Sequence, residues 1–292
     1  MITIITPSYN RAYIIGKAYE SLIAQTSKDF EWLIIDDGSK DNTKEVVEEF
    51  IKENKIKIRY YYKENGGKHT ALNLGIKKAK GDYILILDSD DRLTPNAVSR
   101  VLEVWKKYKS ENEIACLSFS KVYPNNKKIG KEYSGTEIRS NHIDFRCNQE
   151  LTGDMCEIYR TKVLRKYPFP VFNNERFLSE AIVWNKIGSN YDTIYMNEGI
   201  YIGEYLNDGL SKNWFKLVVN NPLGARANNL LFMSKKFKFK IRLKNSIMYN
   251  VFSFIAKKPI FKETNMKLTS LIFYIPSFFV AKFLEFKYKI KG

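Results

Sequence analysis

The stretch Gly81–Asp91, which reads GDYILILDSDD, constrains this chain more than any other. Its apolar run Ile84–Leu87 is typical of a strand that is buried on both faces of a sheet. The carboxylates of Asp88, Asp90 and Asp91 follow at once, and acids this close repel one another unless a cation lies among them. The pattern therefore predicts either a site for a divalent cation, which prefers oxygen ligands, or a solvated acidic turn before the next helix.

Strand and helix patterns alternate upstream of this stretch. Buried strands are expected at Ile2–Thr6, Phe30–Ile35 and Ile56–Tyr62, and each is followed by a polar loop and a segment with helical periodicity. The order βαβαβαβ predicts an α/β fold, in which helices flank a mostly parallel sheet. Ligands of such sheets bind at the carboxyl ends of the strands.

Four polar clusters follow the predicted strands, at Pro7–Arg11, Asp36–Ser39, Asn65–His69 and Asp88–Asp91. We expect them to meet, because parallel strands end at the same edge of a sheet. Together they supply cations, acidic acceptors and a glycine pair that lets backbone approach a ligand, which suits a nucleotide diphosphate. The chain lacks GxGxxG and GxxxxGK[ST], which disfavours a Rossmann dinucleotide site and a P-loop.

The sequence of these clusters resembles a known family. TPSYNR follows the first strand, IIDDGSKDNT includes the end of the second, and NGGKHTALNLGIKKAKGDYILILDSDD surrounds the third helix and fourth strand. In this order and spacing they resemble the inverting glycosyltransferases of family 2, which have the Rossmann-like GT-A fold. The resemblance implies a catalytic domain over residues 1–210, with a nucleotide-sugar-binding half at 1–91 and an acceptor-binding half at 92–210.

The resemblance also implies roles for particular residues. Asp88-Ser89-Asp90 corresponds to the DxD motif, so Asp90 and Asp88 would hold a Mn²⁺ or Mg²⁺ ion that bridges the two phosphates. Asp36 would accept a hydrogen bond from the base, for which uridine is expected, and Asp91 would lie near the donor sugar. The further positions that would contact the nucleotide, ribose or diphosphate are Thr6, Pro7, Tyr9, Arg11, Lys68, Asn73 and Asp88.

Inversion in a single displacement requires a general base for the acceptor hydroxyl. Many family members carry an acidic Glu-Asp pair where this chain has Ser179 and Glu180. Glu180 is therefore the first candidate for the base, although its place before an apolar helical run also suits a carboxylate at a helix N-terminus. Asp154 is the second candidate, and it equally suits a turn.

The last 82 residues differ in composition from the rest of the chain. Residues 211–292 carry 17 Lys and Arg but 2 Asp and Glu, out of a net charge of +16 for all 292 residues. The longest uncharged run there, Leu268–Ala281, is shorter than the roughly 20 residues that span a bilayer. We predict a basic, mainly helical C-terminal region over residues 211–292, in which residues 235–292 bind an anionic membrane surface. The alternative is a helical subdomain with a solvated basic face, and nucleic-acid binding is disfavoured.

The predicted function is metal-dependent inverting transfer of a sugar, from a nucleotide diphosphate donor to a glycan or lipid-linked acceptor, in bacterial surface polysaccharide synthesis. Two alternatives are a non-catalytic scaffold that keeps the nucleotide-sugar fold and a nucleotidyltransferase. Three cysteines without CxxC spacing, and an N-terminus without a signal-peptide pattern, favour a cytoplasmic location. Because lipid-linked acceptors are expected there, we predict a peripheral location on the inner face of the cell membrane.

Overall fold

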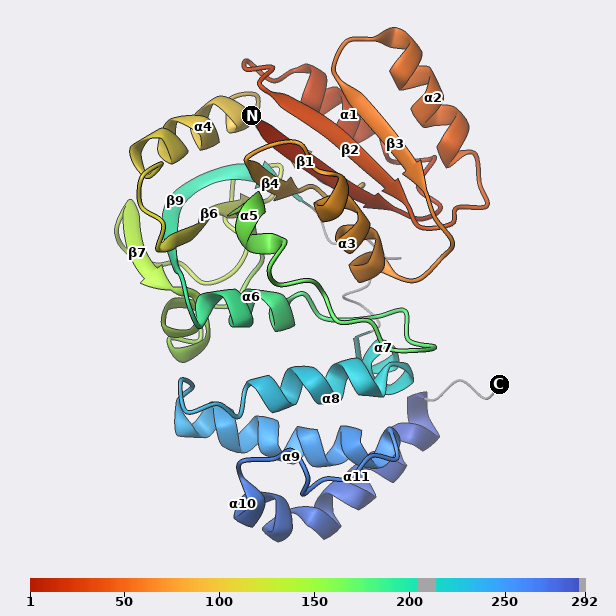
Figure 1. Ribbon diagram of the computed structural model, residues 1–292, viewed down its shortest axis with the longest axis vertical. Coiled ribbons are helices and arrows are strands. Elements are labelled where there is room, and N and C mark those ends of the chain that lie inside the picture. The colour runs from red at the N-terminus through yellow and green to blue at the C-terminus, as the bar shows by residue number, and fades with distance from the viewer. Residues whose placement is uncertain (204–213, 289–292) are drawn as a thin grey trace.

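The first half of the chain builds one parallel sheet in the computed structural model, which describes residues 1–203 and 214–288 (Figure 1). Strands β3, β2, β1 and β4 lie side by side in that order, and all their pairings are parallel. The predicted α/β alternation is thereby confirmed. The elements are β1 (Ile2–Ser8), α1 (Gly16–Ile23), β2 (Phe30–Asp36), α2 (Thr43–Glu53), β3 (Ile58–Tyr62), α3 (Lys68–Lys78) and β4 (Tyr83–Ile86).

Helix α3 begins at Lys68, three residues before the Ala71 at which its apolar pattern starts. The carbonyl oxygen of Gly67 accepts hydrogen bonds from the backbone N–H groups of Thr70 and Ala71, at 2.9 and 3.3 Å. Gly67 itself has a φ of 92°, a conformation that glycine adopts without strain. The early start places Lys68 in the first turn of the helix, beside the carboxyl ends of the strands.

The second half extends the sheet with antiparallel pairings. Strand β8 lies between β4 and β6 and is antiparallel to both, while β9 runs parallel to β6 and antiparallel to β5 and β7. Leu85 pairs with Ile158, so the first residues of β8 lie beside the carboxyl end of β4. The elements are β5 (Arg92–Leu93), α4 (Ala97–Lys107), β6 (Ile114–Val122), β7 (Glu137–Asn141), the π-helix η1 (Ile143–Asn148), β8 (Met155–Arg160), α5 (Thr161–Leu164), α6 (Ala181–Gly188) and β9 (Asp192–Ile202).

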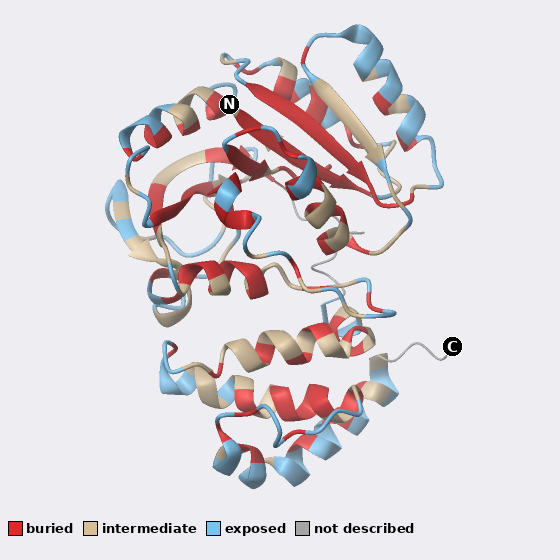
Figure 2. Cartoon of the chain, in the orientation of Figure 1, coloured by how far each residue is buried: buried red, intermediate tan, exposed pale blue. Residues whose placement is uncertain are grey.

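The hydrophobic core lies on both faces of the sheet, and adjacent strand residues contribute to opposite faces. Ile4 belongs to the same buried cluster as Trp105 of α4, whereas the next residue, Ile5, belongs to the cluster that contains Trp184 of α6. Figure 2 shows β1 and β2 as buried along their length. Each fully buried side chain of this size contributes about 1.5–3 kcal/mol to stability, which makes the sheet a rigid support for the loops at its edge.

A group of helices follows the sheet, so the predicted helical C-terminal region is confirmed. In Figure 1, α8 lies beside α6, and α9 separates α8 from α10 and α11. The carboxylate of Glu175 accepts hydrogen bonds from the N–H groups of Leu223 and Gly224 at the start of α8, at 2.6 and 2.7 Å, which joins the two parts. The predicted boundary at residue 210 lies outside the described residues. The helices are α7 (Trp214–Asn220), α8 (Pro222–Leu231), α9 (Phe239–Ile255), α10 (Lys267–Ile272) and α11 (Tyr274–Tyr288).

Within residues 1–203 and 214–288, no helix has both the length and the apolar character that crossing a bilayer requires. The apolar run Leu268–Ala281 is divided between α10 and α11.

Candidate functional site

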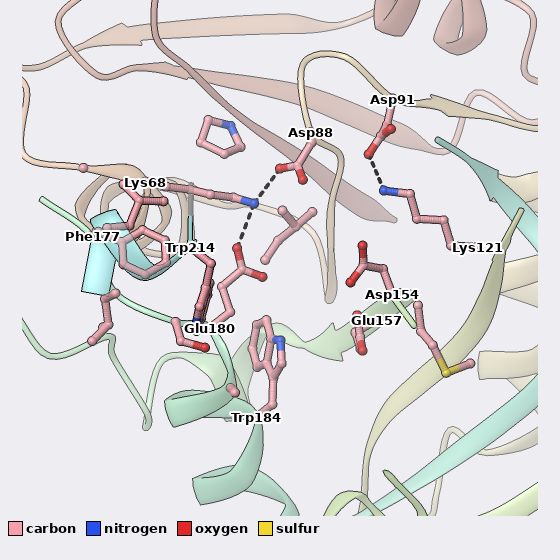
Figure 3. A pocket seen from close by; sticks show the side chains of 18 of the residues that line it. Lys68, Asp88, Asp91, Lys121, Asp154, Glu157, Phe177, Glu180, Trp184 and Trp214 are labelled. Atoms are coloured by element: carbon pink, nitrogen blue, oxygen red, sulfur yellow. Dashed lines mark hydrogen bonds and ion pairs between the residues drawn. The ribbon is translucent and has the colours of Figure 1, made fainter. Parts of the chain in front are cut away.

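A cavity of about 910 Å³ opens at the carboxyl edge of the parallel strands. It is large enough for a ligand of nucleotide size. Residues from both halves of the sheet line it, as do Trp214 and Leu217 of α7 and the residues that flank α8, Asn221 and Phe232 (Figure 3). Nine of the residues predicted from the sequence are brought together here: Pro7, Tyr9, Arg11, Lys68, Asp88, Asp90, Asp91, Asp154 and Glu180.

Lys68 joins the two halves of the cavity. Its Nζ lies 2.7 Å from Oδ1 of Asp88 and 2.8 Å from Oε1 of Glu180 (Figure 3). Burial alone would lower the pKa of Lys68, but the two carboxylates raise it above its ordinary value. Burial likewise opposes ionisation of Asp88, but Lys68 holds the pKa of Asp88 below its ordinary value. The ammonium is therefore fixed as a cation between an acid of the Asp88–Asp91 cluster and the predicted base.

The loop that precedes Lys68 is ordered by the side chain of Asp37. Its Oδ1 and Oδ2 accept hydrogen bonds from the backbone N–H groups of Gly66 and Gly67, at 3.0 and 2.7 Å. Lys63 forms an ion pair with the same carboxylate at 2.5 Å. A Cβ at Gly67 would lie 1.9 Å from the carbonyl oxygen of Arg176, so glycine is needed there for close packing against the second half of the chain.

The acids after β4 have different surroundings. Nζ of Lys121 lies 2.8 Å from Oδ2 of Asp91, yet burial still raises the pKa of Asp91 to about 6. Burial, followed by the charge of Asp88, raises the pKa of Asp90. The backbone N–H of Asp88 donates to the hydroxyl of Tyr201, at 3.0 Å, which fixes the start of the acidic turn.

The donor set suits a divalent cation that arrives with a ligand. No group of three or more His, Cys, Asp or Glu side chains is placed to hold a metal ion in the described part of the chain, so an all-protein metal cage does not fit. Mg²⁺, however, is usually bound by one or two carboxylates plus substrate phosphates. A nearby cation would relieve the repulsion between Asp88 and Asp90, and Asp88 could exchange its contact with Lys68 for a metal ion. Asp88 and Asp90 therefore fit the predicted metal-diphosphate site.

Three predicted residues are not among those that line the cavity. The hydroxyl of Thr6 is buried in the sheet and accepts a hydrogen bond from Nε1 of Trp32 at 2.8 Å. Asn73 is bound through both side-chain polar atoms to the backbone of Phe169. Asp36 is 1% exposed, and its oxygens accept hydrogen bonds from the Ser39 N–H and the Tyr60 hydroxyl, each at 2.7 Å. All three side chains already have hydrogen-bond partners within the protein, and their ligand contacts stay predictions.

The cavity also contains ionisable residues that the motif pattern does not reveal. Lys121 lies near the end of β6 and Glu157 lies in β8, so neither follows a parallel strand of the first half. Burial raises the pKa of Glu157 to about 7, and the charges of Glu180 and Asp154 also raise it. The antiparallel pairing of β8 with β4 places Glu157 beside the acidic turn, and that pairing could not be predicted from local sequence.

Comparison with known proteins assigns this chain to a family. The profile of Glycosyl transferase family 2 matches residues 3–168, which is more than half of the chain. A Campylobacter jejuni protein named GalNAc(5)-diNAcBac-PP-undecaprenol beta-1,3-glucosyltransferase is 25% identical over 313 aligned positions, covering 99% of this chain and 97% of the relative. Several uncharacterised Rickettsia glycosyltransferases are 36–40% identical over 39–46% of this chain, but the aligned parts are only 18–37% of their own lengths.

Solved structures support the same fold. Staphylococcus aureus TarS 1-349 in complex with UDP-GlcNAc superposes with a TM-score of 0.65 at 18% identity, covering 94% of this chain and 79% of TarS. The mannosyltransferase PcManGT from Pyrobaculum calidifontis, in complex with GDP-Man and Mn²⁺, superposes with a TM-score of 0.59 at 16% identity, covering 98% and 84% of the two chains. The fold is that of the GT-A glycosyltransferases, and this chain belongs to glycosyl transferase family 2.

Proposed function

We propose that this protein transfers a sugar from a nucleotide diphosphate donor to a glycan or lipid-linked acceptor, with a divalent metal ion and with inversion. The observation that carries the proposal is the convergence of Asp88, Asp90, Lys68 and Glu180 on one cavity. Such a transfer needs acids that bind a metal ion, a cation that faces the phosphates and a carboxylate that removes a proton.

The residues near the first strand would bind the nucleotide. Tyr9 lines the cavity with 43% of its surface exposed, which leaves its ring available to stack on a base. Arg11 also lines the cavity and would face the negative charge of the ligand. Pro7 would form part of the wall of the nucleotide pocket. Asp91, held by Lys121, would contact the donor sugar.

The diphosphate would bind at Asp88, Asp90 and Lys68. Asp88 and Asp90 would hold a Mn²⁺ or Mg²⁺ ion, which when bound stabilises the charge that develops on the leaving diphosphate. Lys68 is already cationic and lies at the same place, so it would contact a phosphate oxygen directly. PcManGT was crystallised with GDP-Man and Mn²⁺, which supports a metal ion in this role.

Glu180 would be the general base. The acceptor oxygen attacks the anomeric carbon, the bond from that carbon to the diphosphate oxygen breaks, and the acceptor proton passes to the Glu180 carboxylate. Glu180 suits this step because it lies in the cavity, just before α6. It is also near Asp88, because Lys68 contacts both carboxylates. Asp154 lines the same cavity and is the second candidate.

The donor and acceptor classes are proposed from the relatives. A UDP-sugar is supported by the TarS complex with UDP-GlcNAc. A lipid-linked acceptor is supported by the name of the Campylobacter jejuni relative, which aligns over nearly the whole chain. We therefore place the enzyme at the inner face of the cell membrane, in the synthesis of a bacterial surface polysaccharide.

A thermal-shift panel tests the proposal without knowledge of the acceptor. Nucleoside diphosphates and nucleotide-sugars would be compared with and without Mn²⁺. A ligand that binds only the folded state adds about 2.7 kcal/mol of stability at a hundredfold excess over Kd. We expect a uridine nucleotide to raise the melting temperature only when the metal ion is present. A panel in which no nucleotide raises the melting temperature would contradict the proposal.

A further inference from the structure

Helix α11 carries its bulky apolar side chains on the outside of the protein. Its buried side consists of Ser277, Ala281 and Leu284, two of which are small. Its outer side carries a stripe at helical spacing: Ile275, Phe279, Phe283 and Phe286 are 67%, 66%, 59% and 91% exposed. In Figure 2, much of the ribbon of α10 and α11 has the pale blue of exposed residues.

Helix α10 extends this apolar surface. Leu268, Leu271 and Ile272 are 71%, 62% and 61% exposed. An aromatic side chain has roughly 150–250 Å² of surface, so Phe279, Phe283 and Phe286 together expose on the order of 300 Å² or more of apolar area. The four exposed Leu and Ile residues add to this area. A soluble helix normally buries its apolar side and exposes its polar side, and patches of this size mark a contact with another apolar body.

The charged residues beside this apolar surface indicate whether its partner is a second copy of the protein or a lipid bilayer. Lys282 lies with its Nζ 5.7 Å from the ring centroid of Phe278, and Lys287 with its Nζ 5.8 Å from that of Phe283. Glu285 is paired with Lys282 at 3.1 Å. A second copy docked face to face through this surface would bring these lysines against their equivalents, which is unfavourable. Anionic lipid headgroups would instead pair with the lysines while the aromatic side chains enter the acyl layer.

We propose that the outer face of α10 and α11, which we call the docking face, binds directly to the surface of an anionic lipid bilayer. The docking face comprises Leu268, Leu271, Ile272, Ile275, Phe279, Phe283 and Phe286 with the exposed Lys282 and Lys287. This inference refines the membrane location proposed above, and it narrows the predicted membrane segment 235–292 to two helices. Binding to lipid requires neither donor nor acceptor, so it stands apart from the transfer reaction.

The arrangement of the helices separates the docking face from the cavity. Helix α9 lies between α8 and the pair α10 and α11 (Figure 1). The residues of the helical region that line the cavity belong to α7 or flank α8, at Asn221 and Phe232. Ala281 and Leu284 pack in one cluster with Val251 and Phe252 of α9. A substitution on the outer face of α11 therefore leaves both the cavity and the helical core intact.

The test measures binding of the full-length protein to vesicles. One set contains phosphatidylcholine with phosphatidylglycerol, and the other contains phosphatidylcholine alone. The double variant Phe279→Ser with Phe283→Ser removes two apolar anchors without adding charge. The matched control is Tyr62→Ser with Val171→Ser, at residues that are 60% and 59% exposed but lie outside the docking face. Phe239→Ser, 65% exposed at the start of α9, tests the basic stretch 235–244 separately.

We expect wild type, the control and Phe239→Ser to bind the anionic vesicles, and the double variant to bind at least tenfold more weakly. Lys282→Gln with Lys287→Gln should weaken binding to the anionic vesicles more than to the neutral ones. Equal binding of wild type and the double variant would overturn the inference. It would also be overturned if wild type formed dimers that dissociate in the double variant and bound neither kind of vesicle. The melting temperature and the nucleotide-induced shift of every variant confirm folding and report on the transfer site independently.

Discussion

The contact of Lys68 with two carboxylates gives a prediction whose size follows from the geometry. Lys68→Met keeps a long unbranched side chain but removes the ammonium 2.7 Å from Asp88 and 2.8 Å from Glu180. Breaking a fully buried ion pair costs about 3–5 kcal/mol, whereas a surface pair contributes about 0–1 kcal/mol. The three side chains are 30%, 37% and 29% exposed, so solvent screens them in part. We expect a loss of about 1–3 kcal/mol.

Urea unfolding at pH 7.5 measures this loss, and a double-mutant cycle assigns it. Wild type, Lys68→Met, Glu180→Gln and the double variant would be compared. If Lys68 and Glu180 interact, their coupling free energy should be about 0.5–3 kcal/mol. The exposed pair of Lys44 and Glu48, 3.7 Å apart, provides the control and should couple by less than about 0.5 kcal/mol.

The reasoning would be refuted if Lys68→Met cost less than about 0.5 kcal/mol and its effect simply added to that of Glu180→Gln. Such a result would mean that the ammonium does not hold the two carboxylates together in solution. The same variant should also weaken binding of UDP, because the cation that faces the diphosphate is lost.

Two further predictions concern the carboxylates of the cavity. Glu180→Gln should keep metal-dependent donor binding but slow transfer by about 10²–10⁴-fold, as measured by release of nucleoside diphosphate with a lipid-linked acceptor; if only Asp154→Asn has this effect, the base is Asp154. Glu157 has a folded-state pKa of about 7, raised from 4.5, so the stability that it contributes is present below pH 4.5 and is lost as the pH rises through 7. Glu157→Gln removes that loss, so its stability relative to wild type should increase between pH 5 and pH 8 in urea unfolding; a constant difference would contradict the raised pKa.

The sequence predicted the half of the site that depends on parallel strands. Apolar runs followed by polar clusters identify where such strands end, and parallel strands end at one edge. For this reason Arg11, Lys68 and the Asp88–Asp91 acids were expected together, and the structure brings them to one cavity. Asp154 and Glu180 were placed from the family resemblance, and they line the same cavity.

The remaining features depend on contacts between distant segments. Glu157 and Lys121 reach the cavity through antiparallel pairings of β8 and β6, and local periodicity does not encode pairing partners. Thr6 belongs to the TPSYNR motif, yet its hydroxyl is bound to Trp32 in the neighbouring strand, a contact that only the register of β1 and β2 reveals. The docking face could not be predicted either, because composition shows that residues 235–292 are basic and apolar but not which side of a helix faces outward.

The most direct test of the account is titration of UDP into the protein by calorimetry, with and without Mn²⁺, in wild type and in Asp90→Ala. We predict that wild type binds UDP with a requirement for the metal ion, and that Asp90→Ala binds at least a hundredfold more weakly, which corresponds to about 2.7 kcal/mol. Equal affinity with and without Mn²⁺, or equal affinity of the two proteins, would contradict a metal-diphosphate site at Asp88 and Asp90.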